Sequence, residues 1–109
     1  MPAEWEKQES IWITWPYNKK DWPDLFESIP KKVAEIVSII SKTQKVNLII
    51  KLNEKENKII RILKFFSAKL RNIRLLKIQT DRIWIRDFGP IYLVNNRTKI
   101  EIFINFKFN

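Results

Sequence analysis

One short, mainly apolar run, Val46 to Leu52, constrains the fold most strongly because it lies between two longer segments with helical spacing. Residues 31–42 and residues 54–70 both repeat apolar side chains at intervals that place them on one face of a helix. A strand between such helices is expected to be buried on both of its faces. The pattern predicts the α/β fold class, with helices packed against a central strand.

Local signals predict where the two helices begin. Pro30 can occupy the first turn of a helix, where its missing N–H group is not needed, and Ser28 beside it is a candidate N-cap. Asn53 and Glu56 have the spacing of a capping box, in which each side chain bonds the backbone of the other residue. We therefore expect the second helix to open directly after Asn53.

The other regular segments are predicted to be strands. Residues 10–15 and residues 73–78 have strand-like patterns, and residues 90–94 and 100–106 suit an antiparallel pair. The turn between that pair holds two asparagines, which tolerate the left-handed backbone that such turns require. The expected order is strand, helix, strand, helix, strand and hairpin, without a linker and within one domain.

Composition excludes several classes of site. The chain has no cysteine, no histidine and one glycine, so it offers no thiol nucleophile, no disulfide, no zinc site of the usual kind and no glycine-rich phosphate loop. No metal site is expected. No apolar run approaches the roughly 18 residues of a membrane span, and the opening residues lack the pattern of a secretory signal. We expect no membrane partner and, by default, a cytoplasmic location.

The chain is strongly basic, with 21 lysine and arginine residues against 12 acidic ones and a net charge of +9. Such a balance can indicate a nucleic-acid partner. The basic residues are spread along the chain, however, and many lie on the polar faces of the two expected helices. We interpret them as solvated surface and do not expect nucleic acid to bind.

Functional side chains are densest between Thr80 and Pro90, where two arginines, two aspartates and a tryptophan precede the single glycine. So many charges in one strand would need partners, because an unpaired buried charge is very costly. Asp87, ending a strand beside an aromatic ring, could bind a guanidinium, since a carboxylate accepts paired N–H bonds and a ring covers the planar cation. An Arg–Asp network around a tight turn is the alternative interpretation.

Three motifs resemble one known family. The segment Thr80–Pro90 is similar to the T-D-R/x-x-W-x-R-D-x-G-P segment of the agmatine deiminase and bacterial peptidyl-arginine deiminase family. Residues 1–6 and 11–16 resemble the family's usual opening and its first strand, and Trp22 falls where members often carry a tryptophan. The motifs occur in the family's order and together cover residues 1–109.

The resemblance implies a fold and a reaction. Family members form a five-bladed α/β propeller of the pentein type, of which this chain would be about one ββαβ-type blade and the start of the next. A cysteine thiolate attacks the guanidinium carbon, ammonia leaves, and water releases a ureido product. The substrate would be agmatine, giving N-carbamoylputrescine in putrescine biosynthesis, or peptidyl arginine, giving citrulline. No cofactor is implied.

The resemblance also implies roles for four residues of the motif. Asp87 would bind the substrate guanidinium, and Trp84 would cover it or the aliphatic stem, unless Asp87 caps a turn and Trp84 is a core aromatic. Arg86 is expected to pair with an acidic neighbour and fix the turn, and Asp81 to serve the same network. The other four tryptophans, Trp5, Trp12, Trp15 and Trp22, are expected to pack in the core or between blades.

The family's catalytic cysteine and histidine have no counterpart in this sequence. We therefore expect residues 1–109 to be the N-terminal part of a deiminase-like domain, truncated before those segments and inactive alone. Two alternatives stay open: half of a split enzyme completed by a separate C-terminal chain, or a small basic binding module for nucleic acid.

Overall fold

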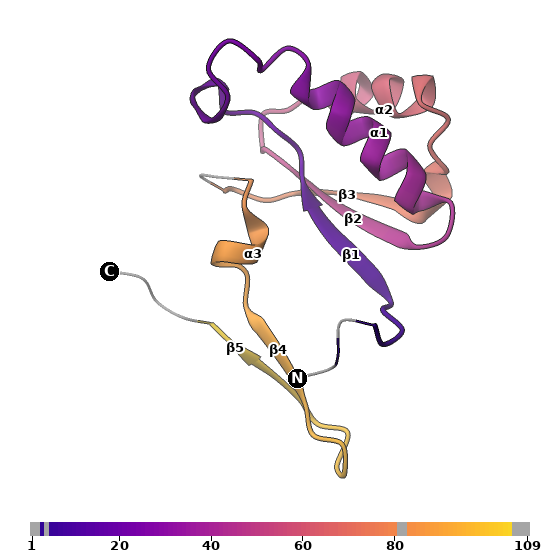
Figure 1. Cartoon of the computed structure of the whole chain (residues 1–109), viewed down its shortest axis with the longest axis vertical. Helices are drawn as coiled ribbons and strands as arrows, with labels where there is room; N and C mark the ends of the chain where they lie inside the picture. Colours follow the sequence, from indigo (N-terminus) through magenta and orange to yellow (C-terminus); the bar gives the residue numbers. More distant parts are fainter. Residues whose placement is uncertain (1–2, 4, 81–82, 106–109) are drawn as a thin grey trace. The chain divides into compact units, whose positions relative to one another are not determined.

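The computed structural model describes residues 3, 5–80 and 83–105 of the 109-residue chain (Figure 1). The chain divides into two compact units. Residues 9–83 form the first, which we call the sheet unit, and residues 1–8 with 84–109 form the second, which we call the hairpin unit. The observed order of strand, helix, strand, helix, strand and hairpin confirms the predicted α/β pattern, with one extra α-helical turn and two short 3-10 helices.

The sheet unit is built on three parallel strands in the order β1-β2-β3. These are β1 (Ser10–Thr14), β2 (Lys45–Ile50) and β3 (Ile73–Lys77). The central strand pairs with both neighbours, so that Leu48 lies opposite Ile13 on one side and Leu75 on the other. Since all three strands run in one direction, their carboxyl ends meet at the same edge of the sheet.

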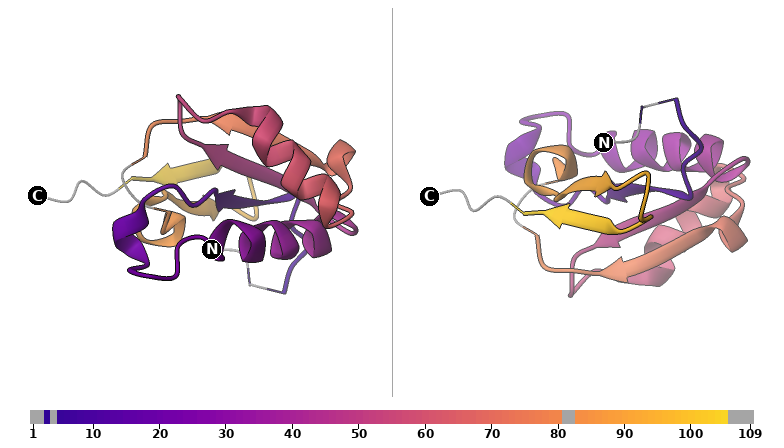
Figure 2. Two further views of the ribbon diagram at one scale, coloured as in Figure 1. Left: turned by 90° about the horizontal axis from the view of Figure 1, so that it is seen from above. Right: turned by 90° about the horizontal axis from the view of Figure 1, so that it is seen from below.

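Two helices, α1 (Ile29–Ser41) and α2 (Glu56–Phe65), cover one face of this sheet (Figures 1 and 2). Both connections join neighbouring parallel strands in the same direction, and right-handed crossovers then place both helices on one side. Leu48 lies at the centre of the core and is fully buried. The buried core consists of Trp15, Ala34, Val37, Val46, Leu48, Ile50, Ile59 and Leu63.

The predicted start of the first helix is close to the observed one, whereas the predicted capping box of the second is wrong. Pro30 lies in the first turn of α1, but the Ser28 hydroxyl donates to the carbonyl of Leu25 at 2.8 Å and makes no cap. Helix α2 begins at Glu56 with Lys55 at the N-cap position and no side-chain cap. The Glu56 carboxylate instead pairs with Lys77 on β3 at 3.3 Å, so it is not available to Asn53.

Helix α2 ends at Phe65, five residues before the predicted end, because the chain turns left-handed at Ser67. The Ser67 N–H donates to the Lys64 carbonyl at 2.9 Å and the Ala68 N–H donates to the Leu63 carbonyl at 3.0 Å. These two bonds form a Schellman motif, which usually places glycine at the left-handed position. In this chain a serine with φ of 57° takes that position.

A buried serine organises the amino edge of the sheet, where α1 leads into β2. The Ser41 hydroxyl, fully buried, donates to the Ser38 carbonyl at 2.8 Å and accepts from the Lys69 N–H at 3.0 Å. The Ser41 carbonyl accepts from the Asn72 side chain at 2.7 Å. Asn72 ends the short 3-10 helix Leu70–Asn72 directly before β3, so these bonds join the end of α1 to the start of β3.

The hairpin unit holds α3 (Ile85–Phe88), β4 (Ile91–Val94) and β5 (Glu101–Ile104). The two strands pair antiparallel as predicted, and the rings of Tyr92 and Phe103 lie 4.9 Å apart in register across them. The asparagines do not supply the left-handed residue of the turn, which is Lys99 with φ of 59°. Asn95 instead accepts backbone N–H bonds through its side chain at 3.0 and 3.2 Å.

The tryptophans other than Trp84 divide between core and surface. Trp15 is 4% exposed and belongs to the core, which confirms that part of the prediction. Trp22, directly after the 3-10 helix Lys19–Asp21, is half-buried, and its ring centre lies 6.3 Å from that of Phe26. Trp5, in the hairpin unit, is 89% exposed. Trp12 is 47% exposed and alternates along β1 with Ile11 and Ile13, which pack against the core, so it lies on the sheet face that neither α1 nor α2 covers. Within the described residues, no helix is long and apolar enough to cross a membrane.

Candidate functional site

The motif expected to bind a cation forms a helical turn, α3, rather than the end of a strand. The Asp87 N–H donates to the Trp84 carbonyl at 2.9 Å, and the Gly89 N–H donates to the Ile85 carbonyl at 2.7 Å. Pro90 follows and has no N–H group with which to continue the turn. The prediction that Asp87 ends a strand is therefore wrong, because local backbone bonds close a turn there.

Trp84 and Asp87 are three positions apart, at the N-cap and at the third residue of this turn. Trp84 at the N-cap position is 49% exposed, and Asp87 is exposed as well. Among the described residues, the Asp87 carboxylate has no ion pair or hydrogen bond. A half-exposed indole and a carboxylate are thus both accessible on the same turn.

Of the two residues predicted to support the site, the structure describes Arg86 but not Asp81. Arg86 lies on α3, exposed, one position before Asp87 and two after Trp84, so the helical rotation separates it from both. Its expected ion pair with an acidic neighbour stays a prediction. Asp81 lies outside the described residues, as does Arg82.

Gly89 is required by the close approach of its own chain. A Cβ atom at this position would lie 2.6 Å from the Ile85 carbonyl oxygen, which is nearer than side-chain carbons come to backbone oxygens. That oxygen is the one that accepts the Gly89 N–H. The only glycine of the sequence therefore stands where α3 closes most tightly.

At the carboxyl edge of the sheet unit, three residues form a chain of contacts that the sequence interpretation missed. The Tyr17 hydroxyl, on the chain that follows β1, donates to the carbonyl of Thr80, which follows β3. The Nζ atom of Lys51, directly after β2, lies 5.0 Å from the centre of the Tyr17 ring. Parallel strand order was the signal that could have predicted this meeting, since it places these three positions at one edge.

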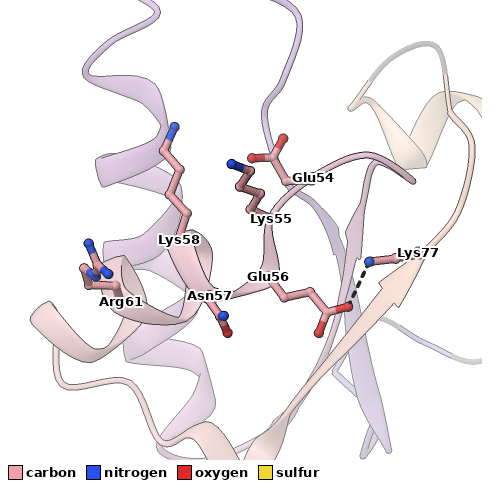
Figure 3. Close-up of a pocket in the computed structure, with 7 residues that line it drawn as sticks. All are labelled: Glu54, Lys55, Glu56, Asn57, Lys58, Arg61 and Lys77. Carbon is pink, nitrogen blue, oxygen red and sulfur yellow. Dashed lines mark ion pairs between the residues drawn. The ribbon is translucent and has the colours of Figure 1, made fainter.

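A depression of about 650 Å³ lies elsewhere on the sheet unit, at the start of α2 (Figure 3). It is lined by residues 54–58, Arg61 and Lys77. Figure 3 shows Glu56 turned from α2 toward Lys77 on β3, with which it forms the ion pair. Acidic and basic side chains alternate here without an aromatic ring, so the depression suits neither a covered guanidinium nor a uniformly basic nucleic-acid groove.

The pair on α3 is better suited to hold a planar cation. A carboxylate favours a guanidinium because several N–H groups can donate to it at once, and an indole face attracts the cation through its ring electrons. The chain supplies no thiol or imidazole for bond breaking. Among the described residues there is also no cluster of three acidic, cysteine or histidine side chains that could hold a metal ion. The chemistry of this turn therefore suits the holding of a planar cation and not the breaking of bonds.

Comparison with known proteins gives a single family. The sequence model of the Porphyromonas-type peptidyl-arginine deiminases matches residues 1–109, the whole chain. A putative agmatine deiminase from Streptococcus mutans is 33% identical over 109 residues, which are 100% of this chain and 28% of the relative. The agmatine deiminase of Pseudomonas aeruginosa is 28% identical over 105 residues, or 93% of this chain and 26% of that protein.

Solved structures agree with the sequence comparisons. C. jejuni agmatine deiminase superimposes on this chain with a TM-score of 0.74 at 32% sequence identity. The superposition covers 99% of this chain and 31% of the C. jejuni chain. A putative agmatine deiminase known from X-ray diffraction gives a TM-score of 0.79 at 32% identity, covering 100% of this chain and 29% of its own. The present chain thus spans about a quarter to a third of the length of the proteins that it matches.

Proposed function

This chain belongs to the Porphyromonas-type peptidyl-arginine deiminase family, and we propose that it supplies the guanidinium-binding side of a deiminase active site. The observation that supports the proposal is the turn α3, which carries Trp84 and Asp87 three positions apart, both exposed, with no partner of the Asp87 carboxylate among the described residues. Both residues occupy the positions that the family motif gives to substrate binding.

In this proposal Asp87 orients the substrate and keeps it cationic. Its carboxylate accepts N–H bonds from the guanidinium, and that negative charge favours the protonated form of the substrate. A planar, fixed guanidinium presents its central carbon to an attacking group in one orientation, and such positioning accounts for a large part of many catalytic rates. The role of Asp87 is binding and orientation, not bond making.

Trp84 covers the bound cation or the aliphatic stem behind it. An indole over a guanidinium contributes about 0.5–1 kcal/mol at an exposed site and more once water is excluded. Arg86 and Asp81 are proposed to support the turn rather than to touch the substrate.

The proposed reaction of the assembled enzyme is hydrolysis of a guanidine. A thiolate adds to the guanidinium carbon, ammonia leaves, and water hydrolyses the thiouronium to a ureido product and regenerates the thiol. The thiol and the base would have to come from polypeptide outside residues 1–109, in the same chain or in a separate one, because this sequence contains neither cysteine nor histidine. The candidate substrates are agmatine and peptidyl arginine.

The wider assignment is part of the same proposal. Residues 1–109 would form the N-terminal part of a deiminase domain and, within it, about one blade and the start of the next in a five-bladed propeller. The similarity to agmatine deiminase structures over the whole of this chain supports that assignment. A cytoplasmic location is proposed with it.

Binding of agmatine to the isolated chain tests the site directly. In a titration followed by amide and indole NMR signals, we expect the signals of Trp84 and of residues 85–89 to shift. Asp87→Asn keeps the size of the side chain but removes its charge, so the affinity should fall by roughly ten- to a hundredfold, as expected for a charge-assisted hydrogen bond worth about 1.5–3 kcal/mol.

Asp24→Asn is the matched control. Asp24 is exposed and has a left-handed backbone, which asparagine also tolerates, so this variant removes the same charge without disturbing the fold. Agmatine affinity should then stay within about twofold of the parent chain. Equal losses in both variants would mean that agmatine responds only to net charge, and the assignment of Asp87 would be wrong.

A further inference from the structure

We propose that a depression between α1 and α2 docks an acidic peptide segment of a partner protein, with an apolar side chain at the centre of that segment. The depression has a volume of about 350 Å³ and lies where the two helices pack against one another. Its lining defines what we call the aromatic depression: Lys31, Arg61, Ile62, Phe65 and Phe66. The inference goes beyond the guanidinium-binding role of α3 and does not depend on it, because every lining residue belongs to the sheet unit.

Phe65 is an apolar side chain that the core of the sheet unit does not use. The stripe of α2 that packs on the core includes Ile59 and Leu63, both fully buried, whereas Phe65 at the end of the helix is 82% exposed. Single exposed apolar side chains are common on protein surfaces and need no explanation. This one is informative because its ring borders a concave surface with further apolar residues.

The apolar part of the lining is ordered by the core beneath it. The rings of Phe65 and Phe66 lie 5.1 Å apart between their centres with planes at 84°, an edge-to-face arrangement that aromatic pairs favour. Phe66 and Ile62 are partly buried and pack against the core. A surface that is ordered before a ligand arrives loses less conformational freedom on binding, which favours affinity.

The charged part of the lining is entirely basic. Lys31, in the first turn of α1, and Arg61, on α2, are both exposed, and neither side chain forms an ion pair among the described residues. Figure 3 shows Arg61 apart from the Glu56–Lys77 ion pair, so that pair does not neutralise its charge. Unpaired cations beside an apolar surface attract carboxylates and repel other cations. Charge complementarity therefore indicates an acidic partner.

The same observations disfavour two other occupants. A second copy of this chain would bring a net charge of +9 to a surface that is itself basic. An anionic membrane would satisfy the cations, but a helix that lies on a membrane presents a long apolar face to it, and the apolar stripe of α2 is buried in the core. A peptide fits better, because the depression has the size of a small-ligand site, about 300–1,000 Å³, and admits one side chain with its adjoining backbone.

The test measures binding of a fluorescent synthetic peptide, in which one phenylalanine is flanked by glutamates, to the complete 109-residue chain by fluorescence anisotropy. Phe65→Ala should weaken binding at least about fivefold, because burial of a large apolar side chain contributes roughly tenfold or more to affinity. Arg61→Gln should weaken binding about two- to fivefold and reduce its dependence on salt, as expected for an exposed ion pair. Both side chains are exposed, so neither substitution should change the thermal midpoint of the chain.

Leu52→Ala and Arg71→Gln are the matched controls. Each changes an exposed side chain of the same class at a position outside the aromatic depression, so affinity for the peptide should stay within about twofold of the parent chain. Two control peptides separate the contributions of the ligand. Replacing its phenylalanine by serine, or its glutamates by glutamines, should weaken binding to the parent chain at least about threefold.

Three results would overturn the inference. The first is no binding of the glutamate-flanked peptide to the parent chain. The second is an equal loss in Phe65→Ala and Leu52→Ala, or equal binding of the phenylalanine and serine peptides, since only net charge would then attract the peptide. The third is tighter binding to phosphatidylserine vesicles than to the peptide, with a loss in Phe65→Ala, which would assign the surface to a membrane. None of these assays contains agmatine, so their failure leaves the proposed function of α3 unaffected.

Discussion

Substitution of the single glycine, Gly89→Ala, is the sharpest perturbation that the structure offers. The added methyl group would meet the Ile85 carbonyl oxygen at 2.6 Å, and that oxygen accepts the hydrogen bond of the same residue at 2.7 Å. The atom that the methyl group would meet belongs to the backbone and cannot rotate away as a flexible side chain could. The chain must therefore move Ile85 and Gly89 apart by several tenths of an ångström and weaken or lose the bond that closes α3.

The expected change in the stability of α3 follows from the loss of that hydrogen bond. Loss of one exposed backbone hydrogen bond costs about 0.5–1.5 kcal/mol, which corresponds to an opening equilibrium that is roughly two- to tenfold more favourable. The effect should be confined to residues 84–89. The backbone of Gly89 lies at φ of −72°, a value that alanine adopts readily, so the prediction rests on the steric contact alone.

Solvent-exchange NMR measures this effect residue by residue. The amides of Asp87 and Gly89 should exchange roughly two- to tenfold faster in Gly89→Ala, and agmatine should bind correspondingly more weakly, whereas the amides of β2 stay as protected as before. Asn96→Ala, in the exposed hairpin turn, serves as a control for replacing a nearby loop residue by alanine. Unchanged exchange at Asp87 and Gly89 would refute the steric argument.

Three other substitutions or assays test separate parts of the structure. Ser41→Ala leaves the partly buried Lys69 N–H without its acceptor and should lower the free energy of unfolding by about 1–3 kcal/mol in urea titrations, and an unchanged free energy would contradict the role of this network. Ser67→Gly relieves the left-handed serine after α2 and should raise that free energy by up to about 1 kcal/mol, whereas a decrease would argue against strain there. The isolated chain should release no ammonia from agmatine, because it has neither thiol nor imidazole, and turnover that persists after control purifications would contradict this.

The sequence predicted the sheet unit well where patterns are local. Apolar periodicity located α1 and α2, and the apolar run predicted β2 as a buried central strand. The capping box failed because Glu56 finds a partner on β3, 21 positions away, which no local pattern reveals. The end of α2 was missed because the chain stops that helix with Ser67 instead of the glycine that usually marks such a stop.

The shape of the segment that carries the candidate site could not be predicted from the sequence, and the roles of its residues stay predictions. The family motif indicated Trp84 and Asp87, whereas a run of alternating charged and apolar residues suggested a strand end. The turn forms because Gly89 allows its N–H group to approach the Ile85 carbonyl closely, a backbone contact that the sequence shows only as one glycine before a proline. The contact of Tyr17 could not be predicted, because its partner is a main-chain carbonyl, a group that every residue carries.

The parallel strands give the sheet unit an amino edge and a carboxyl edge, and each edge has its own set of side-chain contacts. At the amino edge Ser41 joins α1 to Lys69 and Asn72 through partly buried bonds. At the carboxyl edge the Tyr17 hydroxyl bonds the Thr80 carbonyl, and Lys51 lies over the Tyr17 ring. The two edges share no side chain. Substitutions at the amino edge should therefore change the stability of the sheet unit without altering the contacts of Tyr17, Lys51 and Thr80 at the carboxyl edge.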